Sequence, residues 1–200
     1  MTDRESATSQ WEDRDGWDGL VRLFDDLVRD SWGVEEGTED LFEVVDETSG
    51  VFDSAHFQAL LKNTLAELRK RCDEDGYEPR PGEIAVVAAR IVDWERLRHF
   101  VGDGGRAEVC RWVADQLEAL LGPEDDIGRV RTDTFGLLLR GRSAEELPEF
   151  TQRCVEVVES ESCEVYSTEV DIQVRASSAV WEGEHADRLV ERAVRGTSED

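Results

Sequence analysis

Lysine is almost absent from this sequence of 200 residues, and so is any excess of positive charge. Lys62 and Lys70 are its lysines, all other basic residues are arginines, and 48 acidic against 23 basic residues give a net charge of −25. Phosphate backbones and anionic lipids repel such a chain, so we expect neither nucleic acid nor a membrane as a partner. Two explanations of the acidity stay open: a solvated surface as in salt-adapted proteins, or a surface that binds a basic partner or mimics a nucleic acid.

Long apolar runs and metal-binding cysteine patterns are lacking too. No stretch approaches the ~20 apolar residues of a membrane span, and the first residues lack the basic start and apolar core of a signal peptide. The four cysteines form no CxxC pair, and Cys110 and Cys154 fall in helical apolar patterns typical of small buried side chains. We therefore expect a cytoplasmic protein with no metal site and no cofactor.

The chain divides into an acidic lead and a second region with the pattern of a folded domain. Residues 1–15 are polar and aperiodic, and apolar residues then recur at helical spacing over 17–32. Residues 1–47 hold 16 acidic residues and 4 arginines, which is nearly half of the net charge. We predict an acidic lead with an amphipathic helix over 1–41 and a folded domain over 42–200.

Hydrophobic periodicity predicts helices and strands in the second region. We expect a helix with a buried stripe over 57–68, a loop over 72–83, a central strand over 84–92, a short helix over 94–101, a break at 102–105 and a helix to about 120. A hairpin of 127–130 and 135–139, a helix over 148–159, a β-rich stretch over 163–181 and a helix over 182–195 follow. This order indicates an α+β fold, with a sheet covered by helices.

The arrangement that suggests chemistry is the hairpin turn beside the central strand. Asp133 sits on that turn, where its carboxylate can meet groups from the strand over 84–92. Phosphoryl-transfer enzymes with a palm-type sheet need two such carboxylates to hold Mg²⁺ against a triphosphate. The position expected for the partner acid holds Arg90, and Asp93 follows just beyond the strand.

Several motifs stand in the order found in the GGDEF family of diguanylate cyclases, and the resemblance covers roughly residues 42–196. They are DETSGVFDS at 46–54, RIVDWE at 90–95, RTDTF at 131–135, SSAV at 177–180 and ADRLV at 186–190. The resemblance implies a palm or ferredoxin-like, mostly antiparallel sheet flanked by helices, preceded here by an extra N-terminal helix. It also implies the condensation of two GTP into cyclic di-GMP by a face-to-face dimer.

The signature of the family is mostly replaced in this sequence. Its two glycines become Arg131 and Thr132, whose side chains fill space that glycine leaves open for the nucleotide. The signature aspartate is kept as Asp133, the glutamate after it becomes Thr134, and Phe135 is kept. We expect Phe135 in the core, because a hairpin aromatic packs under the sheet.

Other positions that the family uses are replaced as well. The resemblance places Arg90 on the metal-binding aspartate of the first strand, Arg98 and Ala107 on the two guanine-reading residues, and Val194 on a phosphate-binding lysine. Of the inhibitory R-x-x-D site, which binds cyclic di-GMP, only the acid remains, as Asp125. Removing a single electrostatic group of this kind lowers turnover by ~10²-fold or more, so their joint loss should abolish it.

Three hypotheses follow for the function. The first is a degenerate GGDEF domain without catalysis that acts in signal transduction through a protein partner or as a homodimer. The second is a sensor in which Arg90, Arg98 and Arg131 bind GTP, cyclic di-GMP or another anion, with guanidinium in place of the metal. The third is an acidic mimic that occupies a basic partner.

Overall fold

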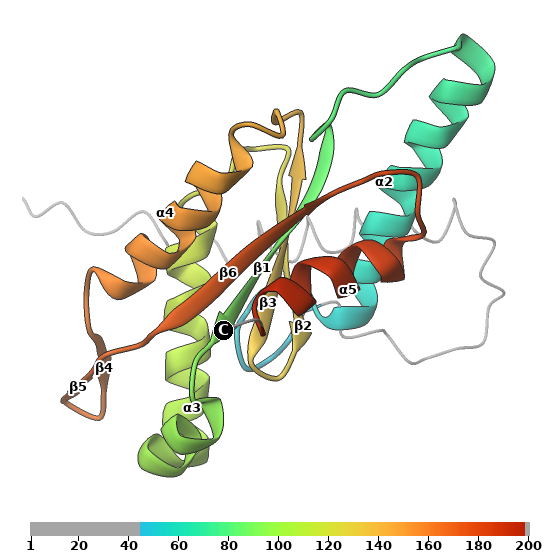
Figure 1. Ribbon diagram of the computed structural model, residues 1–200. Coiled ribbons are helices and arrows are strands. Elements are labelled where there is room, and N and C mark those ends of the chain that lie inside the picture. Colours follow the sequence, from blue (N-terminus) through green and yellow to red (C-terminus); the bar gives the residue numbers. More distant parts are fainter. Residues whose placement is uncertain (1–44, 199–200) are drawn as a thin grey trace, which may run out of the picture. The chain divides into compact units, whose positions relative to one another are not determined.

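The structure is a computed structural model, and it describes residues 45–198 (Figure 1). The helix predicted over 17–32 and the acidic residues around it lie outside this range. Within residues 45–198, no helix is both long and apolar enough to cross a membrane.

A four-stranded antiparallel sheet forms the centre of the domain. Its strands are β1 (Ile84–Ile91), β2 (Asp126–Arg131), β3 (Thr134–Arg140) and β6 (Val174–Val180), in the spatial order β2-β3-β1-β6. Helix α3 (Trp94–Glu118) connects β1 to β2, and helix α4 (Leu147–Glu159) follows β3. A small hairpin of β4 (Cys163–Val165) and β5 (Thr168–Val170) precedes β6. This is the ferredoxin-like palm arrangement, so the predicted fold class is confirmed.

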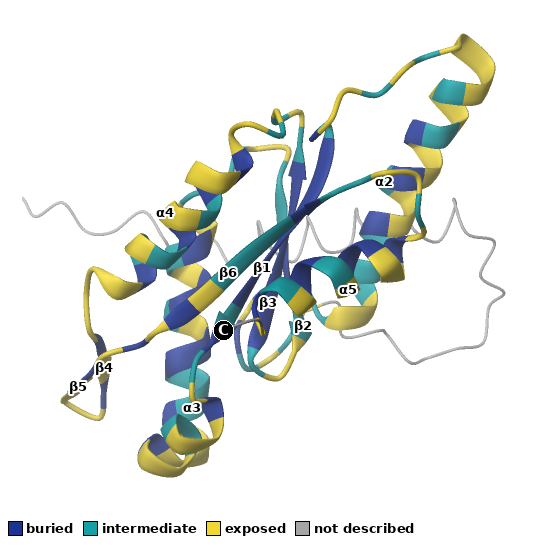
Figure 2. Ribbon diagram, viewed as in Figure 1, coloured by how far each residue is buried: buried dark blue, intermediate teal, exposed yellow. Residues whose placement is uncertain are grey.

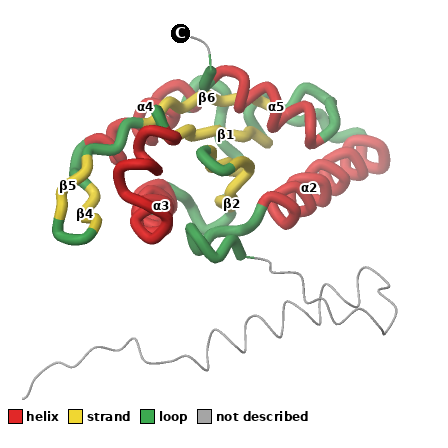
Figure 3. The backbone as a smooth tube through the Cα atoms, turned by 90° about the horizontal axis from the view of Figure 1, so that it is seen from below, coloured by secondary structure: helices red, strands yellow, loops and turns green. Residues whose placement is uncertain are grey.

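Two pairs of helices cover the two faces of the sheet. Helices α3 and α4 pack on one face, and α2 (Ser54–Asp75) and α5 (Ala186–Gly196) pack on the other (Figure 3). Strand β1 is therefore buried on both sides: Val87 contributes to the core under α3 and α4, and Val86 to the core under α2 and α5. Figure 2 shows this strand in the colour of buried residues. The unbroken apolar run of β1 follows from this double burial.

Helix α2 begins and ends where its sequence provides caps. The side chain of Asp53 accepts a hydrogen bond of 2.7 Å from the backbone N–H of His56 at the first turn. Gly76 closes the helix in the left-handed conformation at φ 63°. The loop predicted over 72–83 is therefore too long, because α2 continues to Asp75 before the glycine stops it.

Two other predicted boundaries are wrong. The expected break over 102–105 is a kink at a single residue, Gly102 (φ 71°, ψ −178°), and α3 continues beyond it because Gly105 and Val109 are buried and hold the next turn in place. The last helix begins at Ala186 rather than at 182, because Trp181 and Glu184 take part in a hydrogen-bonded loop before it.

Candidate functional site at the β2–β3 turn

A row of polar side chains crosses the sheet at the end where β1 finishes. Arg90 of β1 is the register partner of Thr134 in β3 and of Arg175 in β6. Thr134 is in turn the register partner of Arg131, at the end of β2. Arg90 lies two residues beyond Ala88, which packs in the core under α2 and α5, so its side chain is on the α5 side of the sheet.

Asp133, on the turn between β2 and β3, forms an ion pair with Arg90. The guanidinium Nε of Arg90 donates to Oδ2 of Asp133 at 2.9 Å, and the hydroxyl of Thr134 donates to Oδ1 at 2.8 Å. A further donor of Arg90 reaches the hydroxyl of Ser198, 3.3 Å away, just after α5. Both oxygens of the Asp133 carboxylate therefore already have partners, and the guanidinium links β1, the turn and the end of α5.

A pocket of about 360 Å³ opens beside this ion pair. It is lined by Arg131, Glu191, Val194, Arg195 and Ser198. Among the described residues, the exposed side chains of Arg131 and Arg195 form no ion pair. Beside the neutralised Arg90, the pocket thus holds two guanidinium groups that can meet an anion, together with the carboxylate of Glu191.

Arg98 lies apart from this row. It is in the first turns of α3, and its guanidinium donates to the carboxylate of Glu95 at 2.9 Å. No contact within residues 45–198 joins it to Arg90 or Arg131. Three arginines are predicted from the sequence to bind an anion. The structure brings Arg90 and Arg131 together at the β2–β3 turn but leaves Arg98 apart from them.

A second ion pair beneath the turn has no counterpart among the site residues named from the sequence. Arg129, whose side chain is 7% exposed, donates to Oδ1 of Asp46 at 2.9 Å and also to the carbonyl oxygen of Thr132. The backbone N–H and the hydroxyl of Ser49 donate to the same Asp46 oxygen. Burial alone raises the pKa of Asp46, but the hydrogen bonds from Ser49 and Arg129 and the positive charge of Arg129 outweigh it and lower the pKa.

This pair ties the segment before α2 to the β2–β3 turn. The backbone N–H of Arg129 also donates to the carbonyl oxygen of Phe52, in the same segment before α2, at 2.7 Å. The sequence signal that could have identified Arg129 is a charged residue within the predicted strand over 127–130, because an arginine buried in a strand requires a partner.

Asp125, at the start of the hairpin, is a structural anchor in this domain. Its side chain is 4% exposed, and it accepts hydrogen bonds from the backbone N–H groups of Gly122 and Arg140 and from the guanidinium of Arg142. Phe135 lies in the core beneath the sheet, as predicted.

Comparison with known proteins explains this architecture. The family model described as "Diguanylate cyclase, GGDEF domain" matches residues 43–198, so the chain belongs to the GGDEF family. No curated protein matches the chain at a significant level.

Several solved structures share the fold. The GGDEF domain of DgcB from Caulobacter crescentus, in complex with c-di-GMP, has a TM-score of 0.67 at 18% identity and covers 82% of this chain and 91% of its own. The FimX GGDEF domain from Pseudomonas aeruginosa has the same TM-score and identity over 78% of this chain and 92% of its own. The diguanylate cyclase SiaD from Pseudomonas aeruginosa, in complex with its activator SiaC, has a TM-score of 0.65 at 17% identity, over 92% of this chain and 70% of its own.

The residues at the turn do not suit the divalent cation that the family implies. Asp133 supplies a carboxylate at the turn, but its Oδ2 already accepts a hydrogen bond from Arg90 and its Oδ1 accepts one from Thr134. No group of three or more His, Cys, Asp or Glu side chains that could hold a metal occurs within residues 45–198. A cation at the turn would also face the positive charge of Arg90 at close range.

Proposed function

We propose that this GGDEF domain does not condense GTP and acts in cytoplasmic signal transduction through contacts with proteins. The observation that carries the proposal is the ion pair between Arg90 and Asp133. Cyclisation of a triphosphate needs carboxylates that hold a metal against the phosphates. Here the guanidinium of Arg90 stands where the family has one of these carboxylates, and it forms an ion pair with the other carboxylate, that of Asp133.

The side chains of the turn support the same conclusion. Arg131 and Thr132 are both exposed at the tip of the hairpin, where the family signature has two glycines. Glycine allows the backbone to approach a bound nucleotide closely, and a side chain at either position takes up that space. Two independent requirements, a metal site and an open turn, are therefore missing together.

A protein partner is supported by the exposed aromatic residues and by one of the structural relatives. Phe100 in α3 is 70% exposed, and Tyr166 in the β4–β5 turn is 66% exposed. Aromatic side chains are enriched in protein–protein interfaces, so these two exposed positions are candidates for such contacts. SiaD, which shares the fold, is described in complex with an activator protein.

The test is a turnover assay with the full chain. Purified protein is incubated with GTP and either Mg²⁺ or Mn²⁺, and cyclic di-GMP is measured by chromatography and mass spectrometry. The diguanylate cyclase SiaD serves as the positive control under the same conditions. We expect no product from this chain, and cyclic di-GMP that accumulates with time and protein concentration would overturn the proposal.

The pocket beside the turn favours a second candidate function, a sensor for GTP, cyclic di-GMP or another anionic ligand. Arg131 and Arg195 both line the pocket, and guanidinium groups pair well with phosphate. Calorimetry with GTP, GDP and cyclic di-GMP tests it, with the double variant R131A/R195A as the binding-site variant and R98A as the matched control. Absence of heat with all three nucleotides would remove this candidate.

A further inference from the structure

Within residues 45–198, strand β6 is an edge of the sheet, because β1 is its single neighbour there. Two hydrogen bonds show which residues of β6 direct their backbone groups toward β1. The N–H of Trp181 donates to the carbonyl oxygen of Ile84, and the N–H of Val92 donates to that of Gln173. Since the direction alternates along an antiparallel strand, the odd-numbered residues 173–181 bond to β1. The even-numbered residues of β6 direct their backbone N–H and C=O groups away from the sheet.

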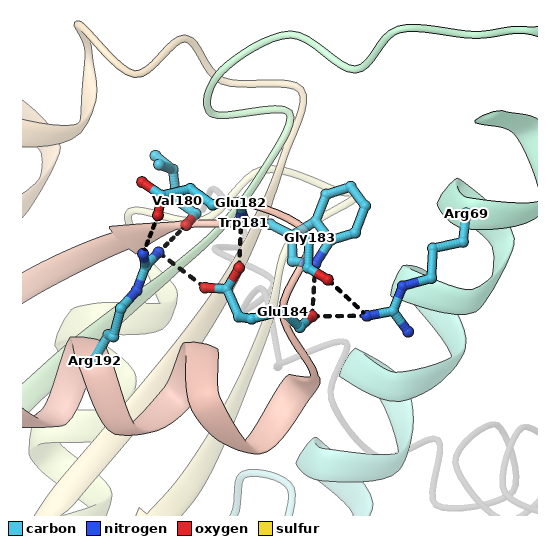
Figure 4. Close-up of polar contacts among 7 residues, drawn as sticks. All are labelled: Arg69, Val180, Trp181, Glu182, Gly183, Glu184 and Arg192. Carbon is cyan, nitrogen blue, oxygen red and sulfur yellow. Dashed lines mark hydrogen bonds and ion pairs between the residues drawn. The ribbon is translucent and has the colours of Figure 1, made fainter.

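Side chains close the outer edge of β6 at its two ends. The N–H of Val174 donates to the carboxylate of Glu159, the last residue of α4, at 3.2 Å. The guanidinium of Arg192 in α5 donates to the carbonyl oxygen of Val180, and the same side chain pairs with Glu182 and Glu184 (Figure 4).

The middle of the edge remains open. Within the described residues, the N–H and C=O groups of Ala176 and Ser178, the C=O of Val174 and the N–H of Val180 have no hydrogen-bond partner in the domain. A hollow of about 450 Å³ lies beside this stretch, lined by Ser178, Ala179 and Val180 together with residues from the start of α4 and the end of α5. Figure 3 shows β6 as the outermost strand, between α4 and α5. An open strand edge of this kind is a template for pairing with another strand.

We propose that β6 pairs with β6 of a second copy of this chain, antiparallel, with Ser177 opposite Ser177 of the partner subunit. In this register Ala176 exchanges both of its backbone hydrogen bonds with Ser178 of the partner subunit. Val174 then faces Val180 of the partner subunit, whose free N–H meets the free C=O of Val174. Every open backbone group of the edge thereby gains a partner, and the two sheets become one continuous sheet.

The pattern of open and closed backbone groups is itself symmetric about Ser177. The N–H of Val174 is closed by Glu159 and the C=O of Val180 is closed by Arg192, so the open groups run from the C=O of Val174 to the N–H of Val180. A two-fold arrangement requires such self-complementarity, since each surface meets a copy of itself.

This inference rests on the protein-contact part of the proposed function, and its test is independent of turnover. The full chain is examined by sedimentation velocity over a range of concentrations, with the variants S178P and S178A. Proline at 178 removes an outward N–H that β1 does not use, so the fold survives while the edge is blocked. Alanine changes the side chain alone. We expect dimerisation of the wild type and S178A, and at least ~10-fold weaker dimerisation of S178P.

Amide hydrogen exchange, read by NMR on the wild type, identifies the register. The outward amides of Ala176, Ser178 and Val180 should become protected as the protein concentration rises. The inward amides of Ser177 and Ala179 should be protected at every concentration, because β1 already bonds them. A monomer at all concentrations, a dimer of S178P as stable as that of S178A, or a dimer whose outward amides exchange as fast as in the monomer would each overturn the proposal. An absence of cyclic di-GMP synthesis bears on neither result.

Discussion

The guanidinium of Arg90 lies 2.9 Å from the carboxylate of Asp133, so a cation and an anion of this chain neutralise each other at the turn where the GGDEF family handles a nucleotide. The contact joins the end of β1 to the β2–β3 turn without a metal ion. Its consequences for stability and for activity can be measured separately.

We predict that the Arg90–Asp133 pair stabilises the fold by no more than about 1 kcal/mol, because the Arg90 side chain is 42% exposed and water screens the pair. A double-mutant cycle of R90A and D133N, followed by urea unfolding, measures the coupling.

The variant R90D places two carboxylates side by side, so it should be less stable than R90A. It should still produce no cyclic di-GMP, because Arg131 and Thr132 remain in the turn. Cyclic di-GMP formed by the single variant R90D would contradict the prediction that Arg131 and Thr132 also prevent synthesis.

The Asp46–Arg129 pair should matter more, since Arg129 is buried. D46N removes the negative partner and leaves a buried guanidinium with a weaker acceptor, so we predict a loss of about 2 kcal/mol at neutral pH. Because the folded pKa of Asp46 is lowered, its contribution is complete above the unfolded value of about 4 and is lost as the pH falls through the folded value. The difference in melting temperature between wild type and D46N should therefore shrink below about pH 4. E47Q, at an exposed neighbouring carboxylate, is the control and should show no such difference.

Much of the fold could be predicted from periodicity. The unbroken apolar run of β1, the polar hairpin turn at Thr132 and Asp133, and the amphipathic pattern of α2 each follow from a local rule. The kink at Gly102 shows the limit of such rules. A glycine cluster predicts a break, but packing of the next helical turn against the core decides that the helix resumes at once.

The site could be predicted in part. The turn and Asp133 follow from the motif order, but the partner of Asp133 depends on which strands are neighbours in the sheet. The pairing of Arg98 with Glu95 rather than with the turn, and that of Arg129 with Asp46, also depend on tertiary structure. The spacing of residues along the sequence does not reveal which of these side chains lie close together in the folded domain.

The four cysteines should differ sharply in reactivity. Cys72 is half-buried on α2, while burial raises the pKa of Cys154 to about 12 and that of Cys163 to about 11, and also raises the pKa of Cys110. At pH 8 a thiol with a pKa of about 11 is ionised to roughly one part in a thousand, and the thiolate is the reactive form. We predict one fast reaction with a thiol reagent in the folded protein and four in denaturant. C72S should abolish the fast reaction, and a second fast thiol in the folded state would contradict the burial described here.

The last prediction concerns two glycines that face each other in the hairpin, Gly128 of β2 and Gly136 of β3, beneath the fully buried ring of Phe57. A Cβ at Gly128 would lie 2.7 Å from the Cβ of Phe57, and a Cβ at Gly136 would lie 2.7 Å from a methyl group of Val130 and 3.0 Å from the edge of the Phe57 ring. The Phe57 Cβ is fixed to the α2 backbone, whereas a methyl group and a ring edge can turn aside. We therefore predict that G128A lowers the free energy of unfolding by about 2–3 kcal/mol and G136A by less. G122A is the control: its new Cβ would lie 3.4 Å from the nearest atom, so its effect should stay within about 0.5 kcal/mol. If urea unfolding found G128A as stable as G122A, helix α2 could not pack against the paired glycines as described, because the two backbones would then have room for a methyl group between them.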